Sequence, residues 1–465
     1  MNVPPPDIRP SRDSRYPAGP SNLLRVLSGR FLRQTPIELL RQNARDYGDL
    51  VHMHTLDGHI YQFNHPALIQ ELMVVHEREN RRVLTMQRAR ALLGDGLLTS
   101  EEPLHMRQRR MAAPAFHRER IAAYGLVIGR QAKEIASRWQ PGEMDVHPAM
   151  LRLALLIVGK CMFDIGDEAE AERIARAVSA FMVTPPPNWV PAVVLEKLQK
   201  AQIGPVKKAY QGMADLDAIL YALIAERRSQ PGDRGDLLSM LMGAEDTEGS
   251  DDDQRMSDRQ VRDECLTVLL AGHETTANAL SFTLRLLAEH PAAQEQAHLE
   301  AVEVLGSREA AASDYPALTY IHNVFAEGMR LMPTVWTLGR SCGPEPYQFH
   351  GYTVPPGATL LAPQVVVHRD GRFWDDPEQF LPERFANDAK ATRPKFAYFP
   401  FGGGSRQCIG ESFAWMEGVL SLATMLRDWR FHLPPGSKRP LPTTVSVNLR
   451  PKHGVVLLLE RRSSR

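Results

Sequence analysis

A glycine-rich loop near the C-terminus carries a cysteine directly before a predicted helix. The loop runs from Phe401 to Gly410, with Cys408 near its end. A thiolate at a helix N-terminus is stabilised by unpaired backbone N–H groups and by the positive end of the helix dipole. The glycines at 402–404 let the backbone turn and come close to a flat ligand. Arg406 offers a cation for a carboxylate of that ligand.

The cysteine loop is compatible with more than one role. A lone cysteine is commonly a small buried hydrophobic residue. The glycines could hold phosphate, but the pattern GxxxxGK[ST] is missing. The segment 403–407 is close to a nucleophile elbow but lacks the final glycine. The loop also meets the needs of a thiolate that reaches a porphyrin iron from below and favours O–O cleavage. The loop alone does not decide between a buried cysteine and such a ligand.

One segment predicts a very long helix. Ser257 and Gln260 form a capping-box pattern, and no strong breaker follows until Pro291. The helix is therefore expected to have roughly 34 residues and a length of about 50 Å. Its middle, CLTVLLAGHETTANAL, is apolar nearly all round, which is typical of a helix that crosses the centre of a large protein.

Four residues interrupt this apolar helix. Gly272 costs about 1 kcal/mol relative to alanine inside a helix, and Glu274, Thr275 and Thr276 need hydrogen-bond partners when buried. A kink with the threonine hydroxyls bonded back to the helix would account for them structurally. A groove in the helix, opened for a small ligand, would account for them functionally.

Composition narrows the class of protein. The 465 residues carry no formal net charge, which gives no argument for nucleic acid as a partner. The cysteines form no CxxC pair, so a reducing compartment is indicated and neither a disulfide framework nor a zinc site is expected. Residues 1–20 are proline-rich and charged, and a flexible tail is expected there. No run of about 18 apolar residues occurs, so the sequence predicts a cytoplasmic protein with no membrane anchor. The cysteines are Cys161, Cys265, Cys342 and Cys408.

The order of helical and strand patterns predicts one large domain over residues 21–465. Residues 66–333 are mainly helical in pattern, and short strands follow. The expected fold class is therefore mainly α with a small β portion. Three hairpins are predicted, in residues 49–64 around Asp57-Gly58, from 351–354 with 358–362, and from 445–449 with 455–459.

Four motifs in sequence resemble those of the cytochrome P450 family, and the similarity runs from about residue 20 to 460. The cysteine loop meets the pattern FxxGxRxCxG, and the long helix meets the oxygen-binding pattern [AG]Gx[DE]T[TS]. The ExxR and PERF patterns are also present, in the expected order. The matching residues are Phe401, Gly404, Arg406, Cys408 and Gly410; Ala271 to Thr276; Glu327 to Arg330; and Pro382 to Phe385.

The resemblance implies the P450 fold, with a large helical domain, a small β subdomain and a long central helix. It implies haem b (iron protoporphyrin IX) and a haem-thiolate monooxygenase that inserts one atom of O2 into a small hydrophobic substrate. No flavin- or nicotinamide-binding segment is visible, so electrons are expected from a ferredoxin or flavodoxin with an NAD(P)H-dependent reductase. The alternatives are a peroxide-driven haem-thiolate hydroxylase and a non-catalytic haem sensor or electron carrier. The pair Glu274-Thr275 argues against both.

By position, the resemblance assigns Cys408 as the axial iron ligand. Thr275 is expected to donate to dioxygen bound over the haem, and Glu274 to relay protons from solvent. A buried structural triad below the haem, with no part in the chemistry, is expected from Glu327, Arg330 and Arg384.

The haem propionates need cations, and the resemblance points to a set of them. His105 and Arg109 are four residues apart and share a helix face, although many members have tryptophan where His105 stands. The further expected haem contacts are Arg340, Arg406, Phe401, Gly402, Gly410, Ala271 and the weaker candidate His368.

Two more features concern the substrate and the electron donor. Residues 333–338 match a pocket-lining segment, so Val335 and Trp336, with Ala271, are expected to border a lipid-like, terpenoid or aromatic substrate, unless they only pack in the core. The region 182–194 is expected to form the roof of the pocket. A basic patch for an acidic donor is expected from Arg107, Arg110, Arg372 and Lys395.

Overall fold

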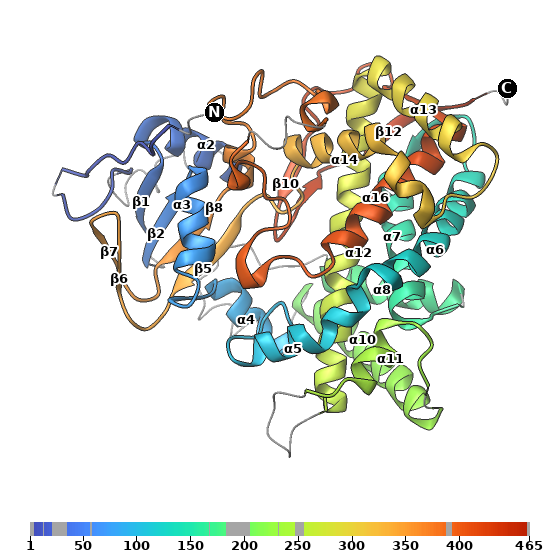
Figure 1. The fold of residues 1–465 in the computed structure, drawn as a ribbon, viewed down its shortest axis with the longest axis horizontal. Coiled ribbons are helices and arrows are strands. Elements are labelled where there is room, and N and C mark those ends of the chain that lie inside the picture. Colours follow the sequence, from blue (N-terminus) through green and yellow to red (C-terminus); the bar gives the residue numbers. More distant parts are fainter. Residues whose placement is uncertain are drawn as a thin grey trace.

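The computed structural model describes residues 4–12, 14–20, 35–55, 58–166, 168–182, 205–230, 232–246, 255–386 and 393–462 (Figure 1). Its α-helices are α2 Pro36–Tyr47, α3 Pro66–Gln70, α4 Leu84–Leu93, α5 Leu104–Ala112, α6 Arg118–Ser137, α7 His147–Phe163, α8 Glu168–Met182, α10 Pro205–Ser229, α11 Leu237–Gly243, α12 Asp258–Glu289, α13 Pro291–Leu305, α14 Thr319–Leu331, α15 Gln364–Val367 and α16 Glu411–Asp428. Its strands are β1 Leu50–Thr55, β2 Gly58–Phe63, β3 Asn80–Arg82, β4 Gly142–Asp145, β5 Leu338–Cys342, β6 Tyr347–Phe349, β7 Tyr352–Val354, β8 Thr359–Ala362, β9 Trp429–His432, β10 Thr443–Val445, β11 Leu449–Pro451 and β12 Val456–Arg461.

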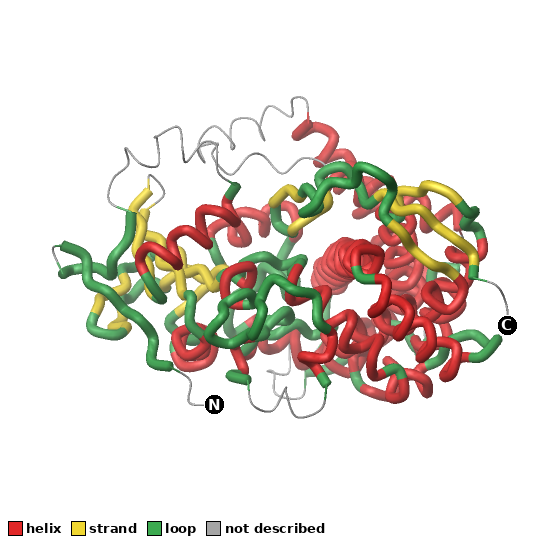
Figure 2. Tube along the Cα trace, turned by 90° about the horizontal axis from the view of Figure 1, so that it is seen from above, coloured by secondary structure: helices red, strands yellow, loops and turns green. Residues whose placement is uncertain are grey.

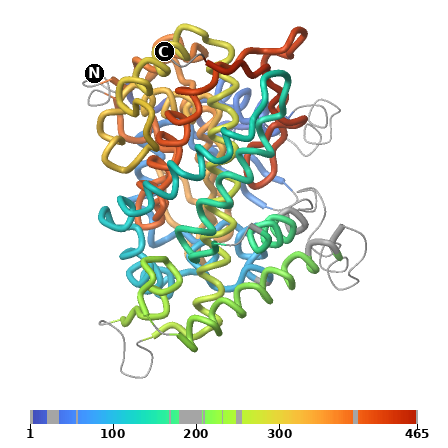
Figure 3. Tube along the Cα trace, turned by 90° about the vertical axis from the view of Figure 1, so that its right-hand side faces the viewer, coloured from blue at the N-terminus to red at the C-terminus, as the bar shows by residue number. Residues whose placement is uncertain are grey.

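The long predicted helix is α12, and it is capped as the sequence indicates. The Ser257 side chain accepts from the Gln260 N–H, and the Gln260 side chain accepts from the Ser257 N–H. Helices α7, α10, α14 and α16 all pack against α12, which runs through the helical part of the molecule (Figures 1 and 3). A Cβ on Gly272 would lie 2.9 Å from Val158 Cγ2 of α7. Glycine at this position therefore lets α12 and α7 pack closely.

The largest sheet has the strand order β1-β2-β8-β5-β3. Only the β2–β8 pair is parallel, and the other neighbours are antiparallel. Figure 2 shows this sheet at one end of the molecule and most of the helices at the other. The sheet joins strands from the first hundred residues to strands that follow α14, so it positions segments from both parts of the chain.

Of the three predicted hairpins, one is confirmed and two are wrong. β1 and β2 are antiparallel with Thr55 opposite Gly58, and residues 56 and 57 of their turn lie outside the described residues. β7 pairs with β6, whereas β8 pairs with β2 and β5. β11 pairs with β10, whereas β12 pairs with β4 and β9. Local alternation identifies a strand, but its partner depends on segments elsewhere in the chain.

The described residues of the N-terminal segment contact the sheet. The Asp7 N–H donates to Asp49 Oδ2 at 2.7 Å, and the His52 N–H donates to the Ala18 carbonyl at 3.1 Å. Residues 4–12 and 14–20, for which a flexible tail is predicted, therefore have fixed partners in the folded part of the chain. Among the described residues, no helix combines the length and the apolarity needed to span a membrane.

Candidate active site

The loop that carries Cys408 turns sharply before α16. The Cys408 N–H donates to the Phe401 carbonyl at 2.9 Å, and α16 begins at Glu411. Gly402 and Gly404 have φ angles of 76° and 73°. Glycine adopts this region at no steric cost. The turn that presents the sulfur therefore depends on these two glycines.

Packing against the rest of the protein also requires glycine in this loop. A Cβ on Gly403 would lie 2.6 Å from the Phe396 ring, and one on Gly404 would lie 2.1 Å from the Met73 carbonyl. Both approaches are too close for any side chain. The glycines thus let the loop lie against its own protein, in addition to any approach to a ligand.

The Cys408 side chain is exposed, whereas the other three cysteines are buried, and all four are free thiols. Surrounding protein nevertheless raises the pKa of the Cys408 thiol to about 11, because desolvation outweighs the Gly410 N–H and Arg109, which both lower it. The sulfur therefore reaches open space on one side and is enclosed on the others. The thiol keeps its proton at neutral pH unless a metal cation replaces it.

A second accessible surface lies in the middle of α12. Val268, Ala271, Gly272 and Thr275 are partly or fully exposed, whereas every other residue from 261 to 285 is buried. Their spacing of three and four residues places them on one face of the helix. An accessible stripe within a packed group of helices indicates a space beside α12. The helix that follows Cys408, α16, packs against this same helix.

The side chains of the predicted pair Glu274 and Thr275 on α12 have different hydrogen-bond partners. Thr275 Oγ1 donates to the Ala271 carbonyl at 2.7 Å, which is the back-bonded arrangement of a threonine within a helix. Glu274 is buried and accepts from Asn448 Nδ2 and Arg450 Nη2, each at 2.9 Å. Successive helix residues point about 100° apart, and in the described structure no hydrogen bond joins these two side chains. The predicted relay therefore does not connect them directly.

Buried cations gather between β3, β5 and the cysteine loop. The β3–β5 register places Arg82 opposite Arg340. Burial, followed by the charge of Arg406, lowers the pKa of Arg82 to about 9 and that of Arg340 to about 10. Such a cluster is unfavourable by itself and favours a bound anion. The sequence motifs identify Arg340 and Arg406 but not Arg82, because only the strand register brings Arg82 to this place.

His105 lies beside the same cations. Burial, followed by the neighbouring arginines, lowers its pKa to about 3, which outweighs its 3.1 Å contact with the half-exposed Glu102. A neutral ring whose Nδ1–H donates to Glu102 has no second N–H to offer. An anion bound next to the ring would raise its pKa again and restore that donor. The arginines whose charges act on His105 are Arg82, Arg109, Arg340 and Arg406.

Of the remaining predicted propionate ligands, one lies by the cysteine loop and one does not. Arg109 Nη1 donates to the Gln407 carbonyl at 2.7 Å, so it holds the residue next to Cys408. His368 is completely buried, and its Nε2 accepts from the Phe399 N–H at 3.1 Å. In the neutral ring Nδ1 then carries the hydrogen, and this buried atom has no hydrogen-bond partner among the described residues. A contact between His368 and the haem stays a prediction.

The structural triad has the predicted geometry. Arg330 donates to both carboxylate oxygens of Glu327 at 2.6 and 2.7 Å, and Arg384 Nε donates to the same carboxylate at 3.3 Å. The Glu327 and Arg330 side chains are fully buried. Arg330 also donates to three main-chain carbonyls between residues 368 and 379. The triad therefore fixes the segment that leads to the PERF motif.

The predicted substrate segment packs against the chain near β10 and β11. Trp336 Nε1 donates to the Ser446 carbonyl at 3.3 Å, and both Val335 and Trp336 are half-buried. Of the predicted roof, residues 183–194 lie outside the described residues.

Three of the four members of the predicted basic patch pair with carboxylates, and the role of the patch in binding an electron donor stays a prediction. Arg107 and Arg110 both pair with Asp246, at 3.1 and 3.2 Å. Arg372 binds Asp49 and Asp370, each at 2.6 Å. Spacing along the sequence could not reveal these partners, since Asp246 and Asp49 are far from the arginines in the chain.

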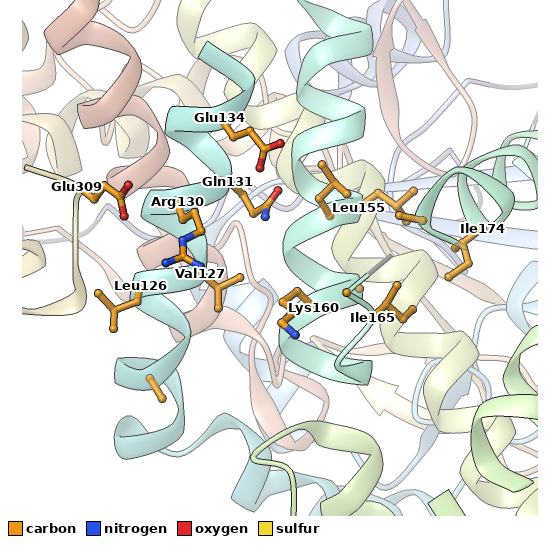
Figure 4. A pocket seen from close by; sticks show the side chains of 15 residues that line it. Leu126, Val127, Arg130, Gln131, Glu134, Leu155, Lys160, Ile165, Ile174 and Glu309 are labelled. Carbon is orange, nitrogen blue, oxygen red and sulfur yellow. The ribbon is translucent and has the colours of Figure 1, made fainter. Parts of the chain in front are cut away.

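A groove elsewhere in the molecule contains none of these residues. It has a volume of about 670 Å³ and lies between α6 and α7 (Figure 4). Apolar side chains such as Leu126, Leu155 and Ile165 line it together with charges of both signs, among them Arg130 and Glu134. The groove thus offers neither the thiol nor the cation cluster.

A helical fold around a long central helix, a cysteine presented at the start of α16 and a buried cation cluster together define a haem-thiolate type of site. Comparison with known proteins agrees. The cytochrome P450 family model matches residues 17–458, so the chain belongs to the cytochrome P450 family. It is a haem-thiolate monooxygenase with haem b as its cofactor, and it uses O2, an organic substrate and electrons from a redox partner.

Several relatives are similar over most of the chain. Cyclooctatin synthase of Streptomyces melanosporofaciens is 33% identical over 437 residues, which cover 93% of this chain and 94% of the relative. Pentalenene oxygenase of Streptomyces avermitilis is 28% identical, over 84% of this chain and 85% of the relative. The crystal structure of the cytochrome P450DA heme domain superposes with a TM-score of 0.81 at 27% identity and covers 96% of this chain and 97% of that one.

Proposed function

We propose that Cys408 is the axial thiolate ligand of the haem and that the enzyme oxygenates an apolar, terpenoid-like substrate. The observation that carries the first part is the position of the sulfur. It is exposed at the start of α16, its own N–H is bound by the Phe401 carbonyl, and the Gly410 N–H acts on the sulfur. An iron cation would supply the positive charge that a thiolate at this position lacks.

The cation cluster supports the placement of the haem. Arg340 and Arg406 would hold the propionates, and His105 would join them once an anion restores its second N–H. Arg109 would act indirectly, because it binds the Gln407 carbonyl and so holds the residue next to Cys408 in place. When bound, the haem supplies dioxygen binding and reductive cleavage of the O–O bond.

Thr275 and Glu274 would handle protons on different faces of α12. The Thr275 hydroxyl lies on the accessible stripe and holds its proton toward the Ala271 carbonyl. Rotation about χ1 would turn that proton into the space beside the helix. Glu274 would resupply protons, and the partly exposed Arg450 side chain that it pairs with leads toward solvent. Transfer from Glu274 then requires it to leave Arg450 and Asn448.

The substrate class rests on the relatives and on the apolar stripe of α12. Two relatives are named for cyclooctat-9-en-7-ol and for pentalenene, an unsaturated alcohol and an unsaturated hydrocarbon. Ala271 and Val268 present apolar surface beside α12, and we place Val335 and Trp336 at the edge of the same pocket. An apolar cyclic molecule would be held there by the hydrophobic effect.

The electron donor would be a ferredoxin or flavodoxin with an NAD(P)H-dependent reductase. The family match takes up residues 17–458, and no flavin- or nicotinamide-binding segment lies among them. We place the enzyme in the cytoplasm, since its four cysteines are all free thiols.

Spectroscopy of cysteine variants tests the axial ligand. The purified wild type should contain haem, and its reduced carbonyl complex should have a thiolate-type spectrum. Cys408→Ser should lose that spectrum, whereas the control Cys342→Ser, at a buried cysteine in β5, should retain it. A Cys408→Ser protein with an unchanged spectrum would overturn the assignment.

A substrate screen then tests the activity. Apolar terpenoids should shift the ferric spin state, and the protein reconstituted with donor and reductase should release an oxygenated product. Turnover with peroxide but not with donor proteins would favour the peroxide-driven hydroxylase. A spin shift without product in every reconstituted system would favour the non-catalytic haem protein.

A further inference from the structure

Arg82 and Arg340 form an unusual pair in the large sheet. They are direct cross-strand partners of β3 and β5. Like charges directly opposite each other destabilise a strand pair. Arg82 follows Arg81 in the chain, and the exposed Arg81 lies opposite Ser341 of β5. The chain therefore places one arginine of this doublet in water and turns the other toward two further buried cations.

Neither of the two opposed guanidinium groups has a carboxylate partner in the described structure. Arg82 Nη2 donates to the Leu97 carbonyl at 2.5 Å, and its buried Nε has no hydrogen-bond partner. Arg340 Nη1 donates only to the Gly339 carbonyl at 3.0 Å. The third cation, Arg406, pairs with Glu101 at 2.7 Å. Glu101, whose charge acts on both Arg82 and Arg340, is already bound by Arg406 and by the Arg82 main-chain N–H. The two guanidinium groups therefore lack ion-pair partners of their own, and a ligand with two carboxylates would supply them.

We propose that Arg82 is a further haem-binding residue, which pairs with a haem propionate beside Arg340 and Arg406. The inference rests on the haem ligation proposed above. A guanidinium with an unused Nε–H can bind a carboxylate through two parallel hydrogen bonds. This contact converts the unfavourable Arg82–Arg340 pair into a clamp on the two sides of one anionic ligand.

The same side chain links the cation cluster to α12. The Leu97 carbonyl accepts from Arg82, and the Leu97 N–H donates to Glu264 Oε2 at 3.0 Å. Arg82 would therefore join the proposed propionate position to the loop that precedes the Arg406 partners Ser100 and Glu101. A purely structural role would use the Leu97 bond alone, and the test has to separate the two.

The experiment measures the rate at which haem leaves the holoenzyme for a haem-scavenging protein. Arg82→Gln should lose haem about tenfold faster or more, as expected for one charge-assisted pair. Arg82→Lys keeps the positive charge but cannot form two parallel hydrogen bonds, so its rate of haem loss should lie between those of the wild type and Arg82→Gln. The matched control Arg81→Gln removes an exposed arginine from the same strand and should behave as the wild type.

Haem dimethyl ester, in which both propionates are uncharged, identifies the partner. In proteins reconstituted with this ester, Arg82→Gln and the wild type should release it at similar rates. An equal acceleration with both cofactors would show that Arg82 acts only through Leu97, and no acceleration with haem would also overturn the proposal. The reduced carbonyl complex of Arg82→Gln should keep a thiolate-type spectrum. If the wild type itself lacked this spectrum, the assignment of Cys408 as axial ligand would be contradicted, and not the role of Arg82.

Discussion

At the scale of single residues, the hydroxyl of Thr275 can be tested apart from the rest of α12. Thr275→Ala removes the proton donor on the accessible stripe and also its bond to the Ala271 carbonyl. General acid–base groups typically contribute at least a hundredfold. We therefore expect product formed per NAD(P)H to fall by about tenfold or more, with the missing electrons recovered as hydrogen peroxide. Both quantities are measured in the reconstituted system.

Thr275→Ser is the matched control for that measurement. Serine keeps the hydroxyl and loses only the methyl group, so coupling should stay close to that of the wild type. Coupling that is unaffected by Thr275→Ala would remove this residue from the proton path.

The residues that sequence could identify are those held by a local pattern. Cys408 and Thr275 stand in contiguous motifs, and the geometry around them follows from a few neighbouring glycines and one helix. Arg82 stands in the segment Asn80–Arg82, where nothing distinguishes it from Arg81. Its role depends on a strand that lies far along the chain, and no local pattern carries that information. The carboxylate partners of Arg107 and Arg372 could not be predicted for the same reason.

At the scale of elements, α12 holds the loop before α5 through three successive residues. Arg262 donates to the Leu93 carbonyl, Asp263 accepts from the Asp95 N–H, and Glu264 accepts from the Leu97 N–H. The first two side chains also pair with each other at 2.8 Å. Glu264 has no cationic partner in the described structure, and burial raises its pKa to about 8.

This raised pKa makes stability depend on pH. Between the ordinary pKa of glutamate and about pH 8, the unfolded chain loses the Glu264 proton while the folded protein retains it. Folding stability should therefore decrease as pH rises through this window, by at most about 1.4 kcal/mol per pH unit. Glu264→Gln keeps an acceptor for the Leu97 N–H and removes the titration. It should be more stable than the wild type at pH 8, and the difference should shrink toward pH 5.

Denaturant unfolding at several pH values measures this effect. The exposed Glu303 of α13 provides the control, since Glu303→Gln should leave the pH profile unchanged. A Glu264→Gln profile parallel to that of the wild type would show that the buried carboxyl is not protonated in the folded protein.

At the scale of the whole molecule, the Glu327 triad ties α14 to the segment before the cysteine loop. Removing one partner of a buried ion pair typically costs about 3–5 kcal/mol, because the other charge stays buried without compensation. Glu327→Ala should therefore lower the unfolding free energy by about that amount and yield mostly haem-free or aggregated protein. The haem content per chain and the denaturation midpoint measure this.

A surface ion pair gives the comparison. Lys133 and Glu309 lie 3.3 Å apart with nearly half of each side chain exposed, and such pairs contribute less than about 1 kcal/mol. Glu309→Ala should leave both the haem content and the midpoint nearly unchanged. A Glu327→Ala protein with full haem content would contradict the structural role of the triad.

The strand order of the large sheet has a consequence for biosynthesis. β8 and β5 occupy its middle, and the early strands β2 and β3 lie on either side of them. While the ribosome is still synthesising α12, β2 and β3 lack these neighbouring strands, and the segment with Cys408 emerges later still. Cofactor capture is therefore a late event, possible only when nearly the whole polypeptide is available. A chain interrupted before residue 338 would expose unpaired strand edges and invite aggregation or proteolysis.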